Sequence, residues 1–140
     1  MPTVQLIDEN TNDPRVRAVF DDIKATKKID RVPNFWRALA THPAHLELCW
    51  RQARAIMRPG KLDLRTKEMI ALAVSITNSC RYCINSHTTA AQKLGLDAEA
   101  YGELLEVVGL YNQFNKLVDA MQVEPDVMPD PAWPAAAASR

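Results

Sequence analysis

Two cysteines and a histidine stand within eight residues of this 140-residue chain, at spacings that suit reversible thiol chemistry. Cys80 and Cys83 form a C-x-x-C pair, and His87 follows four residues after the second cysteine. A thiolate can attack an electrophile, a second thiol can close a disulfide with it, and an imidazole can accept the thiol proton. On a helix, residues four apart are neighbours, so the imidazole of His87 can reach the thiol of Cys83.

A carboxylate, Glu68, lies upstream in an apolar run on a predicted helix. A buried carboxylate is costly unless it is paired, and the alternative is a partly exposed glutamate near a helix start, where negative charge is favourable. If the chain folds back at Asn78-Ser79, Glu68 and His87 lie at similar depths along an antiparallel helix pair. We therefore predict a relay Cys83–His87–Glu68, in which the carboxylate holds the imidazole tautomer and stabilises the imidazolium.

The cysteine pair is predicted to open the helix that carries His87. A C-x-x-C at a helix N-terminus is a setting in which thiol pKa values fall below that of free cysteine. Helical residues three apart have Cβ atoms roughly 5–6 Å apart, whereas a disulfide needs about 3.5–4.5 Å. Closing the bond between Cys80 and Cys83 requires a small local adjustment, which favours a reducible disulfide over a permanent one.

Structural interpretations of the same residues remain open. The C-x-x-C could be half of a zinc site, and the four residues together could form a ligand set, although the chain has no second C-x-x-C. A histidine on an apolar face is more often a satisfied core residue than a catalyst. The third cysteine, Cys49, lies between Leu46 and Trp50 at helical spacing and is predicted to be a small core side chain.

Composition bounds the class of protein. Hydrophobic residues make up 47% and charged residues 24%, which predicts a soluble globular chain. Lys+Arg and Asp+Glu both number 17, so no basic face indicates nucleic acid as a partner. No apolar run is long enough to span a bilayer, and the N-terminal residues show no secretory signal. Three cysteines with one C-x-x-C indicate a reducing compartment, so we expect a cytoplasmic protein.

Helical spacing recurs along the chain and strand alternation does not, which predicts an all-α fold, a single-domain orthogonal helical bundle. We expect a domain over residues 1–123 and a Pro/Ala-rich tail over 124–140, with Trp133 on a neighbouring subunit or the tail disordered. Seven helices are expected: one starting at Asp13-Pro14, a short one around Phe35 to Leu39, then 44–57, 64–77, 80–94, one from Asp97 ended by Gly109, and one from Leu110 to Met121.

Glu68, Cys80-x-x-Cys83 and His87 resemble the signature of alkylhydroperoxidase D-like proteins of the carboxymuconolactone decarboxylase superfamily. Segments 32–43 and 111–120 also resemble the family, so the resemblance covers most of residues 30–125. The resemblance implies an all-helical, AhpD-like oligomer, with trimer or hexamer favoured and dimer possible. It also implies reduction of peroxides through a cysteine pair without a bound cofactor or metal.

Carried over by position, Cys83 resembles the peroxidatic cysteine and Cys80 the resolving cysteine. His87 and Glu68 resemble the proton relay. The chain departs from the family at Tyr82, where the best-characterised members have a histidine, and tyrosine does not act as a base near neutral pH. The resemblance implies a peroxide substrate and an external dithiol reductant of the lipoyl or thioredoxin type.

Three hypotheses follow. The first is a thiol-dependent peroxidase that acts on alkyl hydroperoxides. The second is a decarboxylase-like lyase or isomerase using His87 and Glu68, although the decarboxylase branch typically lacks the cysteine pair. The third is a non-catalytic redox-sensing or metal-binding oligomer.

Overall fold

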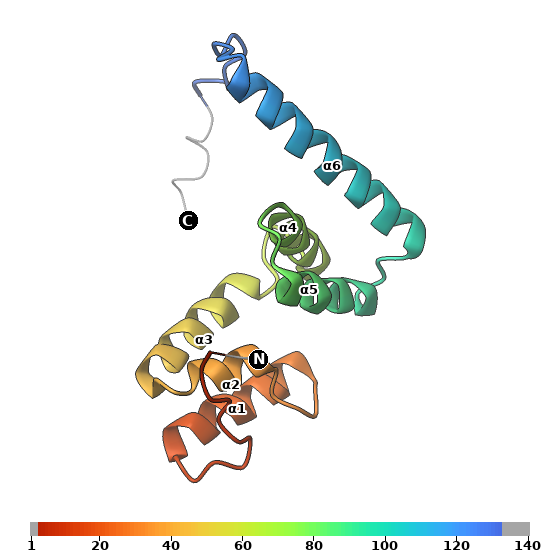
Figure 1. The fold of residues 1–140 in the computed structure, drawn as a ribbon. Helices are drawn as coiled ribbons and strands as arrows, with labels where there is room; N and C mark the ends of the chain where they lie inside the picture. Colours follow the sequence, from red (N-terminus) through yellow and green to blue (C-terminus); the bar gives the residue numbers. More distant parts are fainter. Residues whose placement is uncertain (1–2, 133–140) are drawn as a thin grey trace. The chain divides into compact units, whose positions relative to one another are not determined.

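The computed structural model describes residues 3–132, and every regular element in that range is a helix (Figure 1). The predicted all-α fold is confirmed. Contacts divide the chain into two compact units, Met1–Leu64 and Arg65–Arg140, here called unit 1 and unit 2. Each unit has its own apolar cluster, and the candidate site residues all belong to unit 2.

Unit 1 contains α1 (Pro14–Lys27), α2 (Asn34–Leu39) and α3 (Pro43–Met57). The predicted start of α1 is confirmed, because the Asp13 side chain accepts hydrogen bonds from two backbone N–H groups and proline takes the first helical position. Cys49 packs against the core of this unit, as predicted. The buried apolar residues of the core are Val16, Val19, Phe20, Ile23, Val32, Trp36, Ala40, Leu46 and Trp50.

Unit 2 contains α5 (Arg81–Lys93), α6 (Ala98–Ala120) and all of α4 (Leu64–Thr77) except its first residue. Gly95, with φ of 88°, follows the end of α5, and the side chain of Asp97 caps α6 by accepting from the Ala100 N–H. Asn112 of α6 donates to Thr77 Oγ1 of α4 at 3.0 Å. The buried apolar residues of this unit are Leu72, Ala91, Leu96, Leu104 and Val108.

The predicted break at Gly109 is wrong. A single helix, α6, runs through this position and replaces the expected sixth and seventh helices. An isolated glycine inside a helix costs about 1 kcal/mol relative to alanine but leaves every backbone hydrogen bond possible. Leu110 and Tyr111, directly after Gly109, cannot cap a new helix. Asn112 could, but its side chain donates to the Val108 carbonyl and to Thr77 Oγ1, and the chain continues the old helix.

The segment after α6 contains no helix or strand up to residue 132. Trp133, which we expected to pack on a neighbouring subunit, lies outside the described residues, and the domain limit at residue 123 stays a prediction. Over residues 3–132, no helix combines the length and the apolar character needed to cross a membrane.

Candidate functional site

The site is built where α4 turns back into α5. The turn is closed by backbone hydrogen bonds from Asn78 N to Val74 O and from Cys80 N to Ser75 O, at 3.0 and 2.9 Å. Ser79 occupies the left-handed region at φ of 55°, which reverses the chain within three residues. The turn therefore places the first residues of α5 beside the last turn of α4.

Glu68 and His87 meet across this antiparallel pair. The Nδ1 atom of His87 lies 2.7 Å from Oε2 of Glu68, and the carboxylate residue is only 6% exposed. Of the two readings of Glu68, the structure shows the buried and paired one, in which a hydrogen bond compensates for loss of water. When Nδ1–H donates to the carboxylate, Nε2 of the neutral imidazole is left as an acceptor that can take a proton.

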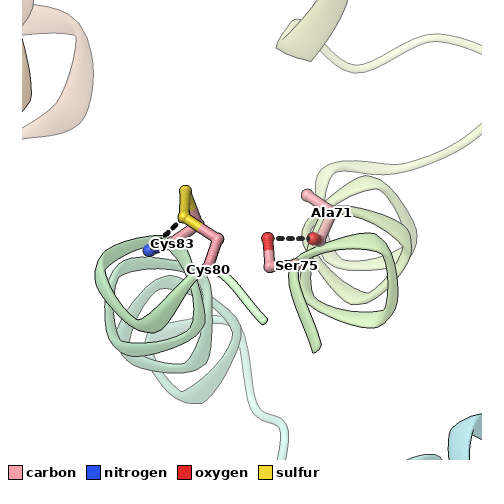
Figure 2. The surroundings of a disulfide bond; sticks show 4 residues. All are labelled: Ala71, Ser75, Cys80 and Cys83. Carbon is pink, nitrogen blue, oxygen red and sulfur yellow. Dashed lines mark hydrogen bonds between the residues drawn. A yellow bond between two sulfur atoms is a disulfide. The ribbon is translucent and has the colours of Figure 1, made fainter. Parts of the chain in front are cut away.

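The two cysteines are joined in a disulfide at the start of α5 (Figure 2), with their Cα atoms 5.3 Å apart. Cys80 is the N-cap residue, and its sulfur accepts a hydrogen bond from Cys83 N at 3.4 Å. Both residues are partly buried. In this oxidised state neither sulfur carries a proton, so the expected transfer from Cys83 to His87 belongs to the reduced protein.

Tyr82, which lies between the two cysteines, is 44% exposed. Within residues 3–132, no group of three or more histidine, cysteine, aspartate or glutamate side chains is arranged to hold a metal ion. The four predicted site residues thus lie on two adjacent helices, as two pairs: a hydrogen-bonded carboxylate and imidazole, and a disulfide.

Ser75, for which the sequence predicted no role, is also buried at the site, at 7% exposure. Its hydroxyl donates to the backbone carbonyl of Ala71 at 2.6 Å. The signal in the sequence was its spacing, because Ser75 lies two helical turns after Glu68 and therefore on the same face of α4.

Comparison with known proteins places this geometry in a family. The family model described as the carboxymuconolactone decarboxylase family matches residues 43–123, a range that contains all four predicted site residues. This chain belongs to the carboxymuconolactone decarboxylase family. The match runs from the start of α3 to just beyond the end of α6.

A solved structure gives a more specific likeness within this family. The chain is 49% identical to the alkylhydroperoxidase AhpD core from Rhodospirillum rubrum, with a TM-score of 0.87 over 90% of this chain and 95% of that one. The chain is therefore an AhpD-like member of the family, as its motif predicted. It is also 34% identical over 55 residues to uncharacterized protein 4 in the cox locus of Paracoccus denitrificans. That match covers 39% of this chain and half the length of the Paracoccus protein.

Proposed function

We propose that this protein is a thiol-dependent peroxidase that reduces alkyl hydroperoxides through Cys80 and Cys83. The observation that carries the proposal is the hydrogen bond from His87 to the buried carboxylate of Glu68, on helices that also hold a C-x-x-C disulfide. A buried carboxylate that orients an imidazole is the arrangement that supports a base, and a vicinal cysteine pair can store two electrons. The likeness to a protein named alkylhydroperoxidase supports the same reaction.

The reaction begins with transfer of the Cys83 thiol proton to the imidazole of His87. The thiolate attacks one peroxide oxygen, the O–O bond breaks, and the departing alkoxide takes the proton back from the imidazolium to leave as an alcohol. Cys83 becomes a sulfenic acid. Glu68 remains ionised throughout and stabilises the imidazolium while it carries the proton.

The second half of the reaction restores the thiols. Cys80 gives up its thiol proton, and its thiolate attacks the sulfenic sulfur of Cys83. The departing hydroxide takes up that proton to leave as water, and a disulfide between Cys80 and Cys83, as in the structure, is formed. An external dithiol, of the small lipoyl type or on a thioredoxin-like protein, reduces the disulfide and is itself oxidised. Because the cycle requires a continuous supply of dithiol, we place it in the cytoplasm.

The decisive experiment measures peroxide consumption with a dithiol donor. Cys83→Ser is expected to abolish turnover, because a serine hydroxyl is not ionised near neutral pH and cannot form a sulfenic acid. Cys49→Ala, which removes the free cysteine of unit 1, is the matched control and should keep wild-type turnover. Turnover that survives Cys83→Ser would overturn the peroxidase proposal, and lyase activity that survives loss of both cysteines would replace it.

We also propose that unit 2 assembles with further copies of itself through α6. No charged residue occurs between Val107 and Asn115, and the apolar side chains there face outward as well as inward. A helix that is apolar all round is normally buried. A hollow of about 370 Å³ lies alongside, between α4 and α6, and its lining is formed by Ala73, Val74, Thr77, Asn78, Val107, Val108, Tyr111, Asn112 and Asn115.

A second copy fits this surface because residues 107–115 of α6 carry no charge, so the same apolar segment of two copies can meet there without repulsion. The exposed apolar residues of α6 are Leu105, Val107, Leu110, Tyr111, Phe114, Leu117 and Val118. Trimeric and hexameric forms are the ones we favour, with a dimer as the smaller alternative.

A further inference from the structure

Two buried polar side chains on α4 face the chemically active residues of α5. Within residues 3–132, the buried polar or charged residues are Glu68 and Ser75, seven positions apart on one helix face. Cys80 and His87 are also seven positions apart, on a helix that runs in the opposite direction. Moving two turns along both helices from the Glu68–His87 contact therefore leads to Ser75 and Cys80. The hydrogen bond from Cys80 N to Ser75 O at 2.9 Å confirms that these two residues are adjacent.

The Ser75 hydroxyl can rotate and donate its hydrogen bond to a different acceptor. Figure 2 shows the Ser75 side chain on the side of α4 that faces Cys80, where its hydroxyl donates to the carbonyl of Ala71. That carbonyl also accepts the ordinary helical hydrogen bond from the backbone N–H four residues later, so it keeps a partner if the hydroxyl rotates. A disulfide sulfur is a weak acceptor, whereas a thiolate is a strong one that attracts a neutral O–H donor.

We propose that Ser75 is a positioning residue for Cys80. In the reduced protein its hydroxyl turns from the Ala71 carbonyl and donates a hydrogen bond to the Cys80 thiolate. The catalytic consequence rests on the proposed function: the thiolate held by Ser75 is the one that attacks the sulfenic sulfur of Cys83 and closes the disulfide. In the reverse sense, when an external dithiol attacks Cys83, the S–S electron pair moves to Cys80, and the same hydroxyl stabilises the departing thiolate.

The other polar and titratable groups near Cys80 influence its thiol equally in the wild-type protein and in Ser75→Ala. Arg81 and Tyr82 follow it on α5 and are exposed, and His87 lies two turns further along the same helix. Residues 70–77 of α4 include no titratable side chain, and from α6 Tyr101 packs against the apolar cluster of unit 2. A change at Ser75 therefore removes a donor without altering the charge around the thiol.

The test measures alkylation of Cys80 by iodoacetamide as a function of pH in the Cys83→Ser background. Mass spectrometry of the separated peptides distinguishes Cys80 from Cys49. Ser75→Ala should move the midpoint of the profile to higher pH and slow alkylation near neutral pH by about tenfold, the order expected for one hydrogen bond to a charged group. Ser86→Ala removes an exposed serine of α5 and should leave the profile unchanged.

A second pair of variants distinguishes the effect of the hydroxyl group from the effect of side-chain packing. Ser75→Thr and Ser75→Val have nearly the same shape, and only the threonine variant should keep the wild-type midpoint. An unchanged midpoint in Ser75→Ala, or equal midpoints for the threonine and valine variants, would overturn the inference. Peroxide is absent from this assay, so loss of the Ser75 effect and loss of peroxidase activity are separate results.

Discussion

Unit 1 has the larger buried apolar cluster, whereas unit 2 exposes many apolar side chains of α6 and buries two polar residues. In unit 1, nine apolar residues are buried, among them Trp36 and Trp50, which make an edge-to-face contact with ring centroids 5.2 Å apart. Polar contacts link α1 to α3 at the surface of this unit: Asp22 accepts hydrogen bonds from the indole of Trp50 at 2.6 Å and from Arg54 at 2.9 Å. Unit 2 has five buried apolar residues in its cluster.

The two units differ in what their buried residues contribute: those of unit 1 stabilise the fold, and those of unit 2 support the chemistry. A closed apolar core gains stability from burial, and it contains no group that can exchange protons or electrons with a substrate. A buried carboxylate and a buried hydroxyl cost stability unless they are hydrogen-bonded. Glu68 is bonded to His87 of α5, and the Ser75 hydroxyl donates to the Ala71 carbonyl of its own helix. We therefore expect substitutions in the core of unit 1 to lower stability, and substitutions at the buried polar residues of unit 2 to alter the thiol chemistry.

The largest effect should follow from opening the core of unit 1. Phe20→Ala removes a fully buried ring and should lower the free energy of unfolding by about 3–5 kcal/mol, because a cavity adds to the lost transfer free energy. Phe35→Ala, at a half-exposed position of the same unit, is the control and should cost much less. Chemical denaturation measures both. Alkylation of Cys83 in the folded fraction should not change. A changed pH profile of that alkylation would show that the core of unit 1 also affects the chemistry of unit 2.

The second effect concerns the relay in unit 2. His87→Ala should lower peroxidase turnover by about a hundredfold or more, the usual contribution of a positioned acid–base group. Glu68→Gln keeps the shape of the side chain but loses its charge, and should also lower turnover, by a smaller factor than His87→Ala. Both should raise the apparent pKa of the Cys83 thiol, as read from iodoacetamide labelling against pH, because the adjacent base or its counter-charge is lost. If neither variant moves the profile, the relay is wrong.

The third effect concerns the exposed side of unit 2. The pair Leu110→Lys and Phe114→Lys places charges on the apolar surface of α6 and should reduce the molar mass in solution, because charges brought together at a symmetric contact repel. Size exclusion coupled to light scattering gives the mass. Leu48→Lys, at an exposed apolar position of α3, should leave it unchanged. A wild-type protein that is monomeric at micromolar concentration would contradict the assembly proposal.

The smallest effect concerns a surface ion pair of unit 1. Arg15 donates to both oxygens of Glu47, at 3.0 and 2.7 Å, and this contact lowers the pKa of the Glu47 carboxyl and raises that of Arg15. Because the folded pKa of the carboxyl is the lower one, its contribution is present above the unfolded pKa and is lost as pH falls through the folded pKa. Arg15→Gln should therefore lower the melting temperature slightly at neutral pH and not at all in acid.

The local signals in the sequence were enough for most of the fold. Asp13 before proline and Asp97 before an apolar run marked helix starts correctly, because capping depends on a few neighbouring residues. Gly109 misled for the same reason: a glycine is a local signal for a helix end, but α6 continues through it. Asn112, a residue type that can cap a new helix, bonds instead to Thr77 and to the Val108 carbonyl. The spacing of the motif residues also predicted that Glu68 and His87 lie at similar depths, which depends only on helical rise and one turn.

The residue types present, and the helix faces on which they lie, can be read from the amino-acid order alone. That Glu68 is buried and bonded to His87 follows from the packing of α4 against α5, because burial depends on which side chains the facing helix presents. Ser75 was missed because a serine on a helix stripe is ordinary until another helix covers it. Its meaning comes from the turn at Ser79, which sets the antiparallel register and so places a hydroxyl opposite Cys80.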